Sequence, residues 1–220
     1  DGNIEVILVD TSSTDGTAEF AASRGICVIT MTQASFTYPK ALNLGFEAAS
    51  HDYVMSLVGH SSLSNTMMLR SLTRWYGLDN FGGLYGLPLP GHNASRSERC
   101  GSAIWMPRLM RAPIVVKQAR PGMLGANACI VNRSAWKKLG GFDERYAGGG
   151  EDTALGRSMI DAGMQVVYEP AFSVFHSHGL GPVNMFRQLK HWRQIAQAKP
   201  QSFDAARLLS RRPDLRRKDK

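Results

Sequence analysis

Residues 4–17 read IEVILVDTSSTDGT, and this stretch decides the fold class of the chain. Residues 4–10 form a short apolar run rich in β-branched side chains, as in a buried strand of a parallel sheet. The polar stretch 11–17 that follows is rich in residues that favour turns and the capped start of a helix. We therefore expect a strand over 4–10 and a helix from about residue 14 to residue 24.

The alternation of strand and helix continues toward the C-terminus. Apolar runs predict further strands, and capping residues or a proline predict the helices between them. The strands are expected at 26–30, 53–58, 81–87, 126–131, 165–168 and 173–175, and the helices at 39–49, 65–76, 134–139, 151–162 and 183–198. This order predicts an α/β sandwich with a mostly parallel sheet. Residues 88–125 contain five Pro, several Gly and many Arg, so we expect long loops there.

Composition excludes several classes of protein. Apolar residues make up 43% of the 220 residues, which indicates a packed core rather than disorder. No apolar run reaches the roughly 18 residues that span a bilayer, and no signal peptide opens the chain. The three cysteines, Cys27, Cys100 and Cys129, match no metal-binding spacing. We interpret them as thiols of a protein in a reducing compartment.

The net positive charge comes from the C-terminal end of the chain. Residues 1–180 hold 15 Lys and Arg against 15 Asp and Glu, whereas residues 181–220 hold 11 against 3, which accounts for the whole net charge of +8. A neutral body argues against nucleic acid as a partner. The basic end either contacts an anionic membrane or is a solvated terminus, and both interpretations stay open. We divide the chain into one domain at 1–198 and a basic tail at 199–220.

Several polar side chains follow the expected strands. Asp10 ends the first strand, where ligands of open α/β sheets bind, and its carboxylate could contact a nucleotide or only cap the next turn. His60 follows the strand 53–58 and could bind a divalent metal or a phosphate, or be structural. Glu151 and Asp152 open a helix after three glycines, either as ordinary first-turn acids or as a base for an acceptor hydroxyl.

A histidine pair follows the last expected strand. His176 and His178 are two residues apart, so in an extended segment they face the same side. Two imidazoles on one side could hold a metal ion or a diphosphate, and the alternative is a surface pair without a ligand.

The order of these segments resembles that of the inverting family 2 glycosyltransferases, which have the GT-A fold, a Rossmann-like three-layer sandwich. The matching segments lie within residues 3–195 and read VDTSSTDGT, YPKALNLGFEAASHDYV, GANACIVNRSAWKKLGGFDE, GGGEDTALGRSMIDAGMQVVYEP and FHSHG. Within that family the chain looks most like bacterial enzymes that add rhamnose or similar sugars to surface polysaccharides. The resemblance therefore implies an α/β protein that binds a nucleotide sugar.

The resemblance also implies roles for individual residues. Asp152 matches the general base that deprotonates the acceptor hydroxyl, and Glu151 would support it or hold the acceptor. Asp10 matches the aspartate that contacts the base or ribose of the nucleotide. Lys40 and Asn43 match positions that line the donor side of the site.

Around the metal, the sequence departs from the family pattern. The family usually has an Asp-x-Asp or a single Asp after the third strand, which holds Mg²⁺ or Mn²⁺ on the donor diphosphate, whereas residues 59–61 here read Gly-His-Ser. Three interpretations stay open: His60 binds the divalent cation with His176 or His178, the enzyme works without a metal, or it is inactive. His60 is then also a donor-side residue, and Asn127 matches a small polar residue beside the acceptor pocket.

A second departure lies at the start of the chain. The family's first strand and helix have no counterpart in this sequence, so we expect the N-terminal βα unit to be missing or its place in the sheet to be filled by another segment.

The sequence thus predicts a glycosyltransferase. It would move a sugar from a nucleoside-diphosphate sugar to a hydroxyl of a glycan or lipid-linked acceptor in one inverting displacement. The alternatives are a catalytically impaired module that binds nucleotide sugars and a sugar nucleotidyltransferase. We expect a cytoplasmic protein, peripheral at the inner face of the plasma membrane if the basic tail binds lipid.

Overall fold

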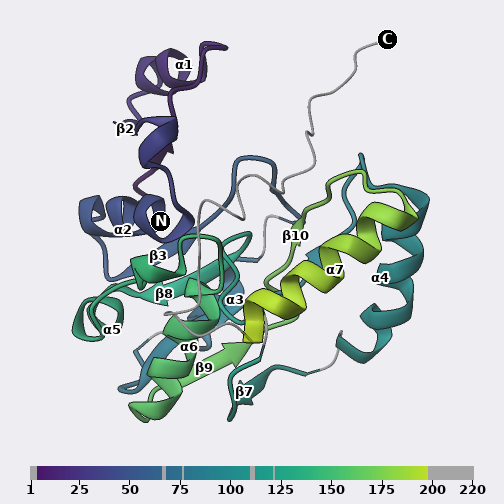
Figure 1. The fold of residues 1–220 in the computed structure, drawn as a ribbon. Helices are drawn as coiled ribbons and strands as arrows, with labels where there is room; N and C mark the ends of the chain where they lie inside the picture. Colours follow the sequence, from purple (N-terminus) through teal and green to yellow (C-terminus); the bar gives the residue numbers. More distant parts are fainter. Residues whose placement is uncertain (1–3, 66–67, 76, 110–111, 121, 198–220) are drawn as a thin grey trace.

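The computed structural model of the protein describes residues 4–65, 68–75, 77–109, 112–120 and 122–197. The basic tail predicted at 199–220 lies outside the described residues, so it stays a prediction. Figure 1 shows a small N-terminal unit, a central sheet with its helices, and two longer helices on the opposite side of the molecule. Among the described helices, none is both long and apolar enough to cross a membrane.

The N-terminal unit has the alternation that its sequence predicts. Strand β1 (Ile7–Asp10), helix α1 (Thr17–Ser23) and strand β2 (Cys27–Thr30) follow one another, and the two strands pair in parallel along their whole length. Helix α2 (Tyr38–Ala48) comes next, with Pro39 in its first turn. A short 3₁₀ helix precedes α2.

The central sheet is mixed, so the prediction of a mostly parallel sheet is wrong. Its strand order is β3-β8-β5-β9-β7, and only β5 and β9 run parallel to each other. The strands are β3 (Tyr53–Ser56), β5 (Phe81–Tyr85), β7 (Ile114–Val116), β8 (Cys129–Asn132) and β9 (Gln165–Tyr168). Strand β8 inserts antiparallel between β3 and β5. A short apolar run predicts burial but not direction, which is decided by pairing between distant segments.

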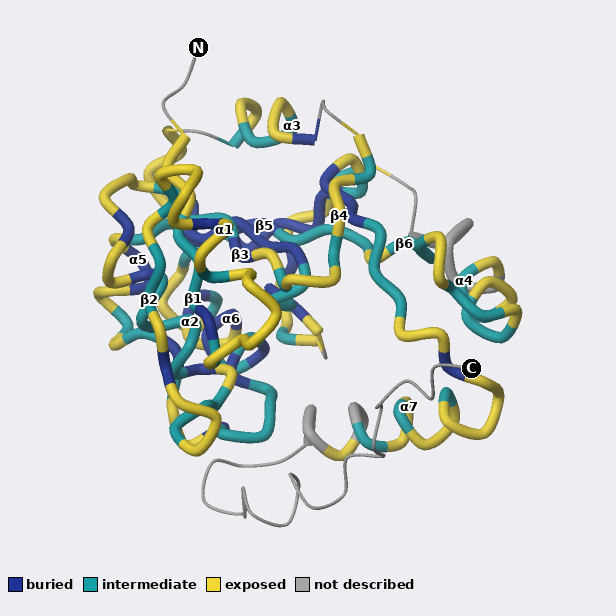
Figure 2. Tube along the Cα trace, turned by 90° about the horizontal axis from the view of Figure 1, so that it is seen from above, coloured by how far each residue is buried: buried dark blue, intermediate teal, exposed yellow. Residues whose placement is uncertain are grey.

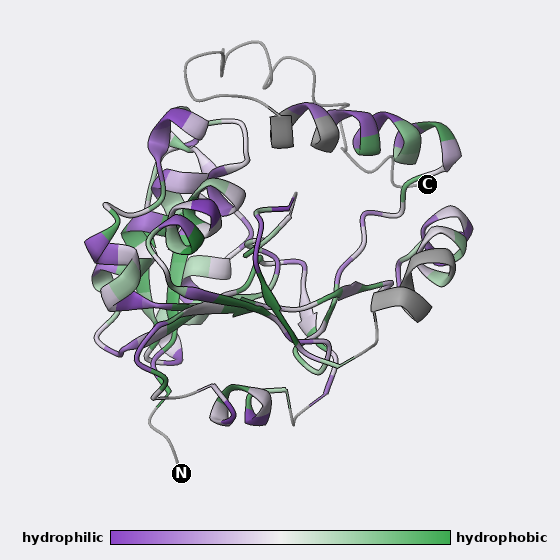
Figure 3. Cartoon of the chain, turned by 90° about the horizontal axis from the view of Figure 1, so that it is seen from below, coloured by the Kyte–Doolittle hydropathy of each residue, from purple (hydrophilic) through white to green (hydrophobic). Residues whose placement is uncertain are grey.

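Packed layers cover both faces of the central sheet, as the prediction of a three-layer sandwich requires. Along β8, Cys129 and Val131 belong to a core with α2, α5 (Arg133–Lys138) and α6 (Glu151–Asp161), whereas Ile130 belongs to a core on the other face. Figure 2 shows these strands as the buried centre of the molecule, and Figure 3 shows the same strands as its most apolar part. The alternation along β8 is the period of two that a strand buried on both faces requires.

A small second sheet joins three distant parts of the chain. Strand β10 (Val174–Phe175) pairs antiparallel with β4 (Ser62–Leu63) and parallel with β6 (Pro88–Leu89). Just before β6, Gly86 crosses the segment that leads into β10 so closely that a Cβ atom on it would lie 1.1 Å from the Phe172 carbonyl oxygen. Only glycine allows this approach of two backbones.

Residues 88–125 are not only loops, which corrects a second prediction. Helix α4 (Arg96–Leu109) occupies their middle. Its start is a reciprocal cap, in which the Ser95 hydroxyl accepts from the Glu98 N–H at 3.1 Å and the Glu98 carboxylate accepts from the Ser95 N–H at 2.8 Å. Helix α7 (Pro182–Gln197) lies beside α4 (Figure 1). The Ser-x-x-Glu spacing was a start signal for α4, but the prolines and glycines around it led to the prediction of loops.

The helix expected over 65–76 is also shorter than predicted. Its described part is α3 (Arg70–Thr73), and residues 66–67 and 76 lie outside the described residues. Residues 62–63 just before it belong to strand β4.

Among the described residues, the β1–β2 pair and the central sheet are not joined by hydrogen bonds between strands. Strand β1 pairs only with β2, and strand β3 pairs only with β8, so no described strand lies along the other edge of β1 or of β3. The expectation that another segment takes the place of the family's first strand is therefore not met within the described part of the chain.

Candidate active site

The predicted acid pair lies at the start of helix α6. Gly149 and Gly150 before the helix have φ angles of 117° and 102°, which side chains other than glycine rarely adopt. This turn leaves Glu151 only 4% exposed, and its Oε2 has no hydrogen-bond partner among the described residues. Asp152 is half-buried, and its Oδ1 accepts the backbone N–H of Thr153. The pair is therefore held at a defined place, with one carboxyl more isolated than the other.

Burial raises the pKa of both acids, but only Asp152 has hydrogen bonds from Thr153 that oppose the rise. Burial raises the pKa of Glu151 to about 8, and the neighbouring Asp152 charge adds to the effect. Burial also raises the pKa of Asp152, but hydrogen bonds from Thr153 stabilise its anion and oppose the rise. At neutral pH, Glu151 therefore keeps its proton while Asp152 is the better candidate for the charged base.

Asn127 and Asp152 both border the backbone at Gly125. A methyl group built on Gly125 would lie 2.8 Å from Asn127 Oδ1 and 3.7 Å from Asp152 Oδ2, so both side chains face the same backbone. The turn that carries Asn127 is tied to α6 by the Gly122 N–H, which donates to Thr153 Oγ1 at 3.2 Å. The predicted base and the predicted acceptor residue thus share one site, the acid cluster, defined by Glu151, Asp152 and Asn127.

The acid cluster lies where β3 ends and the antiparallel strand β8 begins. Ser56, the last residue of β3, donates through its Oγ to the Ala126 carbonyl at 3.0 Å and lies opposite Cys129 in the sheet. Burial raises the pKa of Cys129 to about 12, so it stays a thiol and acts as core. His60 comes four residues after Ser56, so the segment that carries this predicted metal ligand begins at the same end of β3.

His60, His176 and His178 come together as a histidine cluster. One ring nitrogen from each lies within 4.8 Å of the others, and the Nε2 atoms of His176 and His178 are 3.2 Å apart. The antiparallel pairing of β4 with β10 causes this, because it sets Ser62 opposite Phe175 and so brings the two flanking segments together. The prediction that the two late histidines face one side is confirmed, and His60 joins them.

Partial burial favours the neutral form of two of these histidines, His60 and His176. Desolvation and the neighbouring imidazoles lower the pKa of His176 to about 4, and desolvation followed by the charge of His178 lowers the pKa of His60. Neutral imidazoles offer a free lone pair, which is the form that binds a metal ion. His60 and His176 can therefore offer their lone pairs to a cation or donate hydrogen bonds.

Two polar residues that the sequence analysis did not assign support the histidine cluster. Ser61 Oγ lies 3.0 Å from His176 Nδ1, and Glu98 Oε1 accepts the backbone N–H of His178 at 2.9 Å. The Ser95 hydroxyl, from the same cap as Glu98, donates to the Leu180 carbonyl. Glu98 could have been found through its Ser-x-x-Glu cap, whereas Ser61 carries no signal beyond its place next to His60.

Asp10 lies at the end of β1 and is 5% exposed. Its Oδ2 accepts the Ser13 N–H at 2.9 Å, and its Oδ1 accepts the Ser13 hydroxyl, so the carboxylate caps the turn that follows. A contact with a nucleotide stays a prediction.

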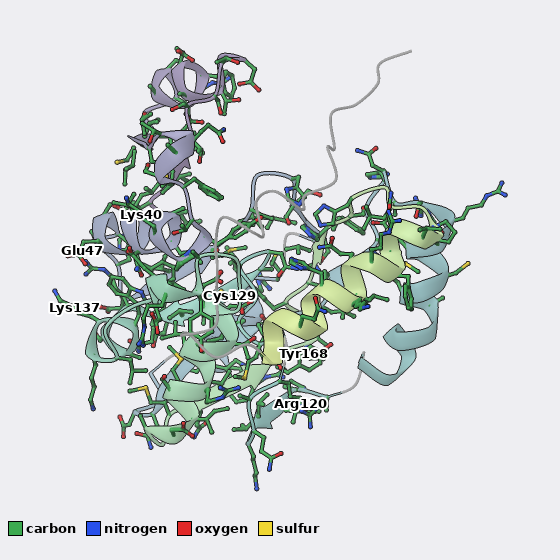
Figure 4. All side chains as sticks on the ribbon, in the orientation of Figure 1. Lys40, Glu47, Arg120, Cys129, Lys137 and Tyr168 are labelled. Atoms are coloured by element: carbon green, nitrogen blue, oxygen red, sulfur yellow. The ribbon has the colours of Figure 1, made fainter. Side chains whose placement is uncertain are left out.

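Lys40 and Asn43 lie elsewhere, in a cavity between α2 and α5. The cavity measures about 400 Å³ and is lined by Lys40, Asn43, Leu44, Glu47, Trp136, Lys137, Gly140, Gly141 and Glu144. The Asn43 amide donates to the Phe142 carbonyl and accepts from the Phe142 N–H, both at 2.8 Å, so it fixes a turn. Figure 4 shows Lys40, Glu47 and Lys137 together at one margin and Cys129 in the interior. No lining residue belongs to the acid or histidine cluster, and a donor-side role for Lys40 and Asn43 stays a prediction.

Replacing Glu151 with Gln is expected to flatten the pH dependence of stability. Between its usual pKa of 4.5 and its folded value of about 8, Glu151 holds a proton in the folded state that the unfolded chain releases. The free energy of unfolding therefore falls as pH rises through this window, by up to about 1.4 kcal/mol per pH unit, and this loss is absent from Glu151→Gln. Urea unfolding across the window measures it, with exposed Glu47→Gln as control. Equal slopes in Glu151→Gln and the native protein would contradict the assignment.

Comparison with known proteins gives the following similarities. Residues 1–79 match the model of the family described as glycosyl transferase family 2. An O-antigen chain rhamnosyltransferase of Salmonella anatum is 25% identical over 193 residues, which cover 84% of this chain and 60% of that protein. An N-acetylglucosaminyl-diphospho-decaprenol L-rhamnosyltransferase of Mycobacterium tuberculosis is 42% identical over 62 residues, 27% of this chain and 20% of that protein. This chain thus spans less than two thirds of either relative.

Among solved structures, a mannosyltransferase from Pyrobaculum calidifontis in complex with GDP-Man and Mn²⁺ is similar in fold. It superposes with a TM-score of 0.60 at 17% identity, over 89% of this chain and 56% of that one. The likeness supports a GT-A-like α/β fold for this chain, while the mixed central sheet is as described above.

Proposed function

We propose that this chain transfers a sugar, because residues 1–79 match glycosyl transferase family 2 and the chain is distantly homologous to bacterial rhamnosyltransferases. The donor would be a nucleoside-diphosphate sugar, with a deoxyhexose such as rhamnose favoured by the relatives. The acceptor would be a hydroxyl of a glycan or lipid-linked saccharide. The observation that carries this proposal is the acid cluster. It holds a carboxyl that is protonated at neutral pH, Glu151, a candidate base, Asp152, and the polar side chain of Asn127.

In the proposed reaction, Asp152 acts as the general base. The acceptor hydroxyl gives its proton to the Asp152 carboxylate while its oxygen forms a bond to the anomeric carbon. The bond from that carbon to the diphosphate oxygen breaks at the same time, on the opposite face, so the configuration inverts. Glu151, protonated at neutral pH, adds no second negative charge beside the base. Asn127 can hold the acceptor, because its side chain and that of Asp152 border the same backbone position, Gly125.

The leaving diphosphate would be met by the histidine cluster. Three ring nitrogens within 4.8 Å of one another fit a single divalent ion, so His60, His176 and His178 would hold it. A bound ion would supply Lewis-acid stabilisation of the charge that develops on the leaving group. The chain's own part is to bring the three imidazoles together after the ends of β3 and β10.

An anionic membrane surface is a further proposed partner, consistent with a lipid-linked acceptor. Helix α7 contains no acidic residue and exposes Val183, Phe186 and Leu189 at 64%, 70% and 45%. Lys190 and Arg187 are exposed next to them. Apolar side chains with adjacent basic ones suit the boundary of an anionic bilayer. This surface and the predicted basic tail would keep the protein at the inner face of the plasma membrane.

A second candidate function is a binding module without catalysis. It is favoured by residues 59–61, where no carboxylate follows β3. A sugar nucleotidyltransferase remains as a third outcome of the same test.

Two parallel incubations separate the three functions. The protein is incubated with UDP-, GDP- and dTDP-linked sugars and a polyprenyl-diphosphate saccharide, with Mn²⁺, and the products are separated. A transferase releases the nucleoside diphosphate and extends the acceptor. Binding of the sugar nucleotide without any release identifies the module. In the second incubation, with nucleoside triphosphates and a sugar phosphate, release of pyrophosphate identifies the nucleotidyltransferase.

A further inference from the structure

The histidine cluster differs chemically from the cation sites that hard ions prefer. Its donors are three imidazole nitrogens, and no Asp or Glu oxygen joins them among the described residues. Mg²⁺ takes oxygen ligands in near-octahedral geometry, whereas imidazole suits zinc, copper, iron and nickel. The donor set therefore does not fit Mg²⁺, and it fits Mn²⁺ less well than the later ions of the series.

The spacing of the nitrogens fits a transition-metal ion. The Nε2 atoms of His176 and His178 are 3.2 Å apart. Two imidazole nitrogens that bind one zinc ion at about 2.0–2.1 Å with tetrahedral angles lie about 3.3–3.4 Å from each other. The nitrogen of His60 lies within 4.8 Å of both, so a small rotation of an exposed side chain would complete a three-nitrogen site.

The cluster also has the outer partners typical of metal-bound histidines. A ligating histidine usually donates its second ring N–H to an acceptor, which fixes its tautomer and its orientation. Ser61 Oγ lies 3.0 Å from His176 Nδ1 and can accept that proton, which leaves the Nε2 lone pair toward His178. Glu98 holds the backbone of His178 in place. These contacts come from three separate segments, so the arrangement does not depend on one loop.

We propose that His60, His176 and His178 bind a borderline transition-metal ion of the Zn²⁺ and Co²⁺ class in preference to Mg²⁺ and Mn²⁺. Three protein ligands leave coordination positions free, and oxygen atoms of a diphosphate would fill them. That last role rests on the proposed function, but the preference for the ion does not. The expected order of affinity is Mg²⁺, Mn²⁺, Co²⁺, Zn²⁺, with Zn²⁺ the tightest.

The metal-free protein titrated with Co²⁺ tests the proposal. A nitrogen site of low coordination number gives a strong visible absorption band, and we expect it to saturate at one Co²⁺ per chain. Zn²⁺ should remove the band at equimolar concentration, whereas Mg²⁺ in large excess should leave it. Isothermal titration with Zn²⁺, Mn²⁺ and Mg²⁺ gives the affinities directly.

Single substitutions locate the site. His176→Ala and His178→Ala should each abolish the visible band, and Ser61→Ala should weaken Co²⁺ binding by about 10–100-fold while keeping the band. His51→Ala, at an exposed histidine before β3, is the matched control and should bind Co²⁺ normally. Far-ultraviolet circular dichroism of each metal-free variant checks folding, and exposed His178 keeps the test valid if His176→Ala does not fold.

The results separate this proposal from the proposed function. An unchanged band in both histidine variants, or displacement of Co²⁺ by Mg²⁺ as readily as by Zn²⁺, would overturn the ion assignment. Sugar transfer with Mg²⁺ alone, and without a Co²⁺ band, would overturn it while the transferase stands. A Co²⁺ band lost in His176→Ala and His178→Ala, with no transfer to any acceptor, would support the metal site and count against the transferase.

Discussion

Asp152→Asn is expected to lower the rate of sugar transfer by about 10³-fold, within the range that a general base contributes. The amide keeps the size of the side chain, and its oxygen can still accept the Thr153 N–H, so the start of α6 should stay folded. It cannot take the acceptor's proton. Binding of the nucleotide should survive, because the substitution leaves Asp10 and the histidine cluster unchanged.

The measurement is the release of nucleoside diphosphate in the presence of acceptor, together with nucleotide affinity by isothermal titration. Asp161→Asn is the matched control, since Asp161 ends the same helix and is exposed. Transfer at the native rate by Asp152→Asn would remove Asp152 from the mechanism. If Asp152→Asn instead loses both nucleotide binding and sugar transfer, Asp152 supports the fold of the donor site.

Gly86→Ala is expected to destabilise the protein by at least about 3 kcal/mol, at the upper end of the cost of overpacking. The added Cβ atom would lie 1.1 Å from the Phe172 carbonyl oxygen and 2.3 Å from its carbonyl carbon. Both are backbone atoms of a buried segment, so no side-chain rotation relieves the clash. Strand β10 follows this segment directly, and the variant should therefore also disturb the histidine cluster.

Urea unfolding measures the free-energy difference, with Gly181→Ala as control because a Cβ atom there would meet nothing within 4 Å. If Gly86→Ala is too unstable to purify and Gly181→Ala is not, the prediction holds qualitatively. If Gly86→Ala is as stable as the control, the close approach of the Gly86 backbone to the Phe172 backbone is contradicted.

Local structure was largely predictable from the sequence, but strand direction was not. The order of β1, α1, β2, α2 and β3 follows from apolar runs and capping residues, which act within a few neighbouring positions. Strand β8 was expected, yet its antiparallel place between β3 and β5 depends on contacts with residues far away in the chain. Helix α4 was missed because the Pro and Gly content of 88–125 outweighed one capping motif.

The candidate site shows the same division. The spacing of His176 and His178 predicts that they share a side, since the period of an extended segment is local. That His60 joins them depends on the pairing of β4 with β10, each only two residues long, which no pattern indicates. The hydrogen bonds of the Asn43 amide with the Phe142 backbone were not predicted, because they join residues far apart in the chain, and the donor-side role of Asn43 stays a prediction.

The separation of the β1–β2 pair from the central sheet has a consequence for local unfolding. The two strands bond to each other but to no strand of the central sheet among the described residues, and Phe20 of the intervening helix is 62% exposed. Such a unit should open at lower free energy than β8, which is paired on both sides. Asp10 belongs to this unit, so the measured affinity for a nucleotide would include the fraction of molecules in which the unit is closed. A nucleotide bound at Asp10 would in turn protect the β1–β2 amides from hydrogen exchange.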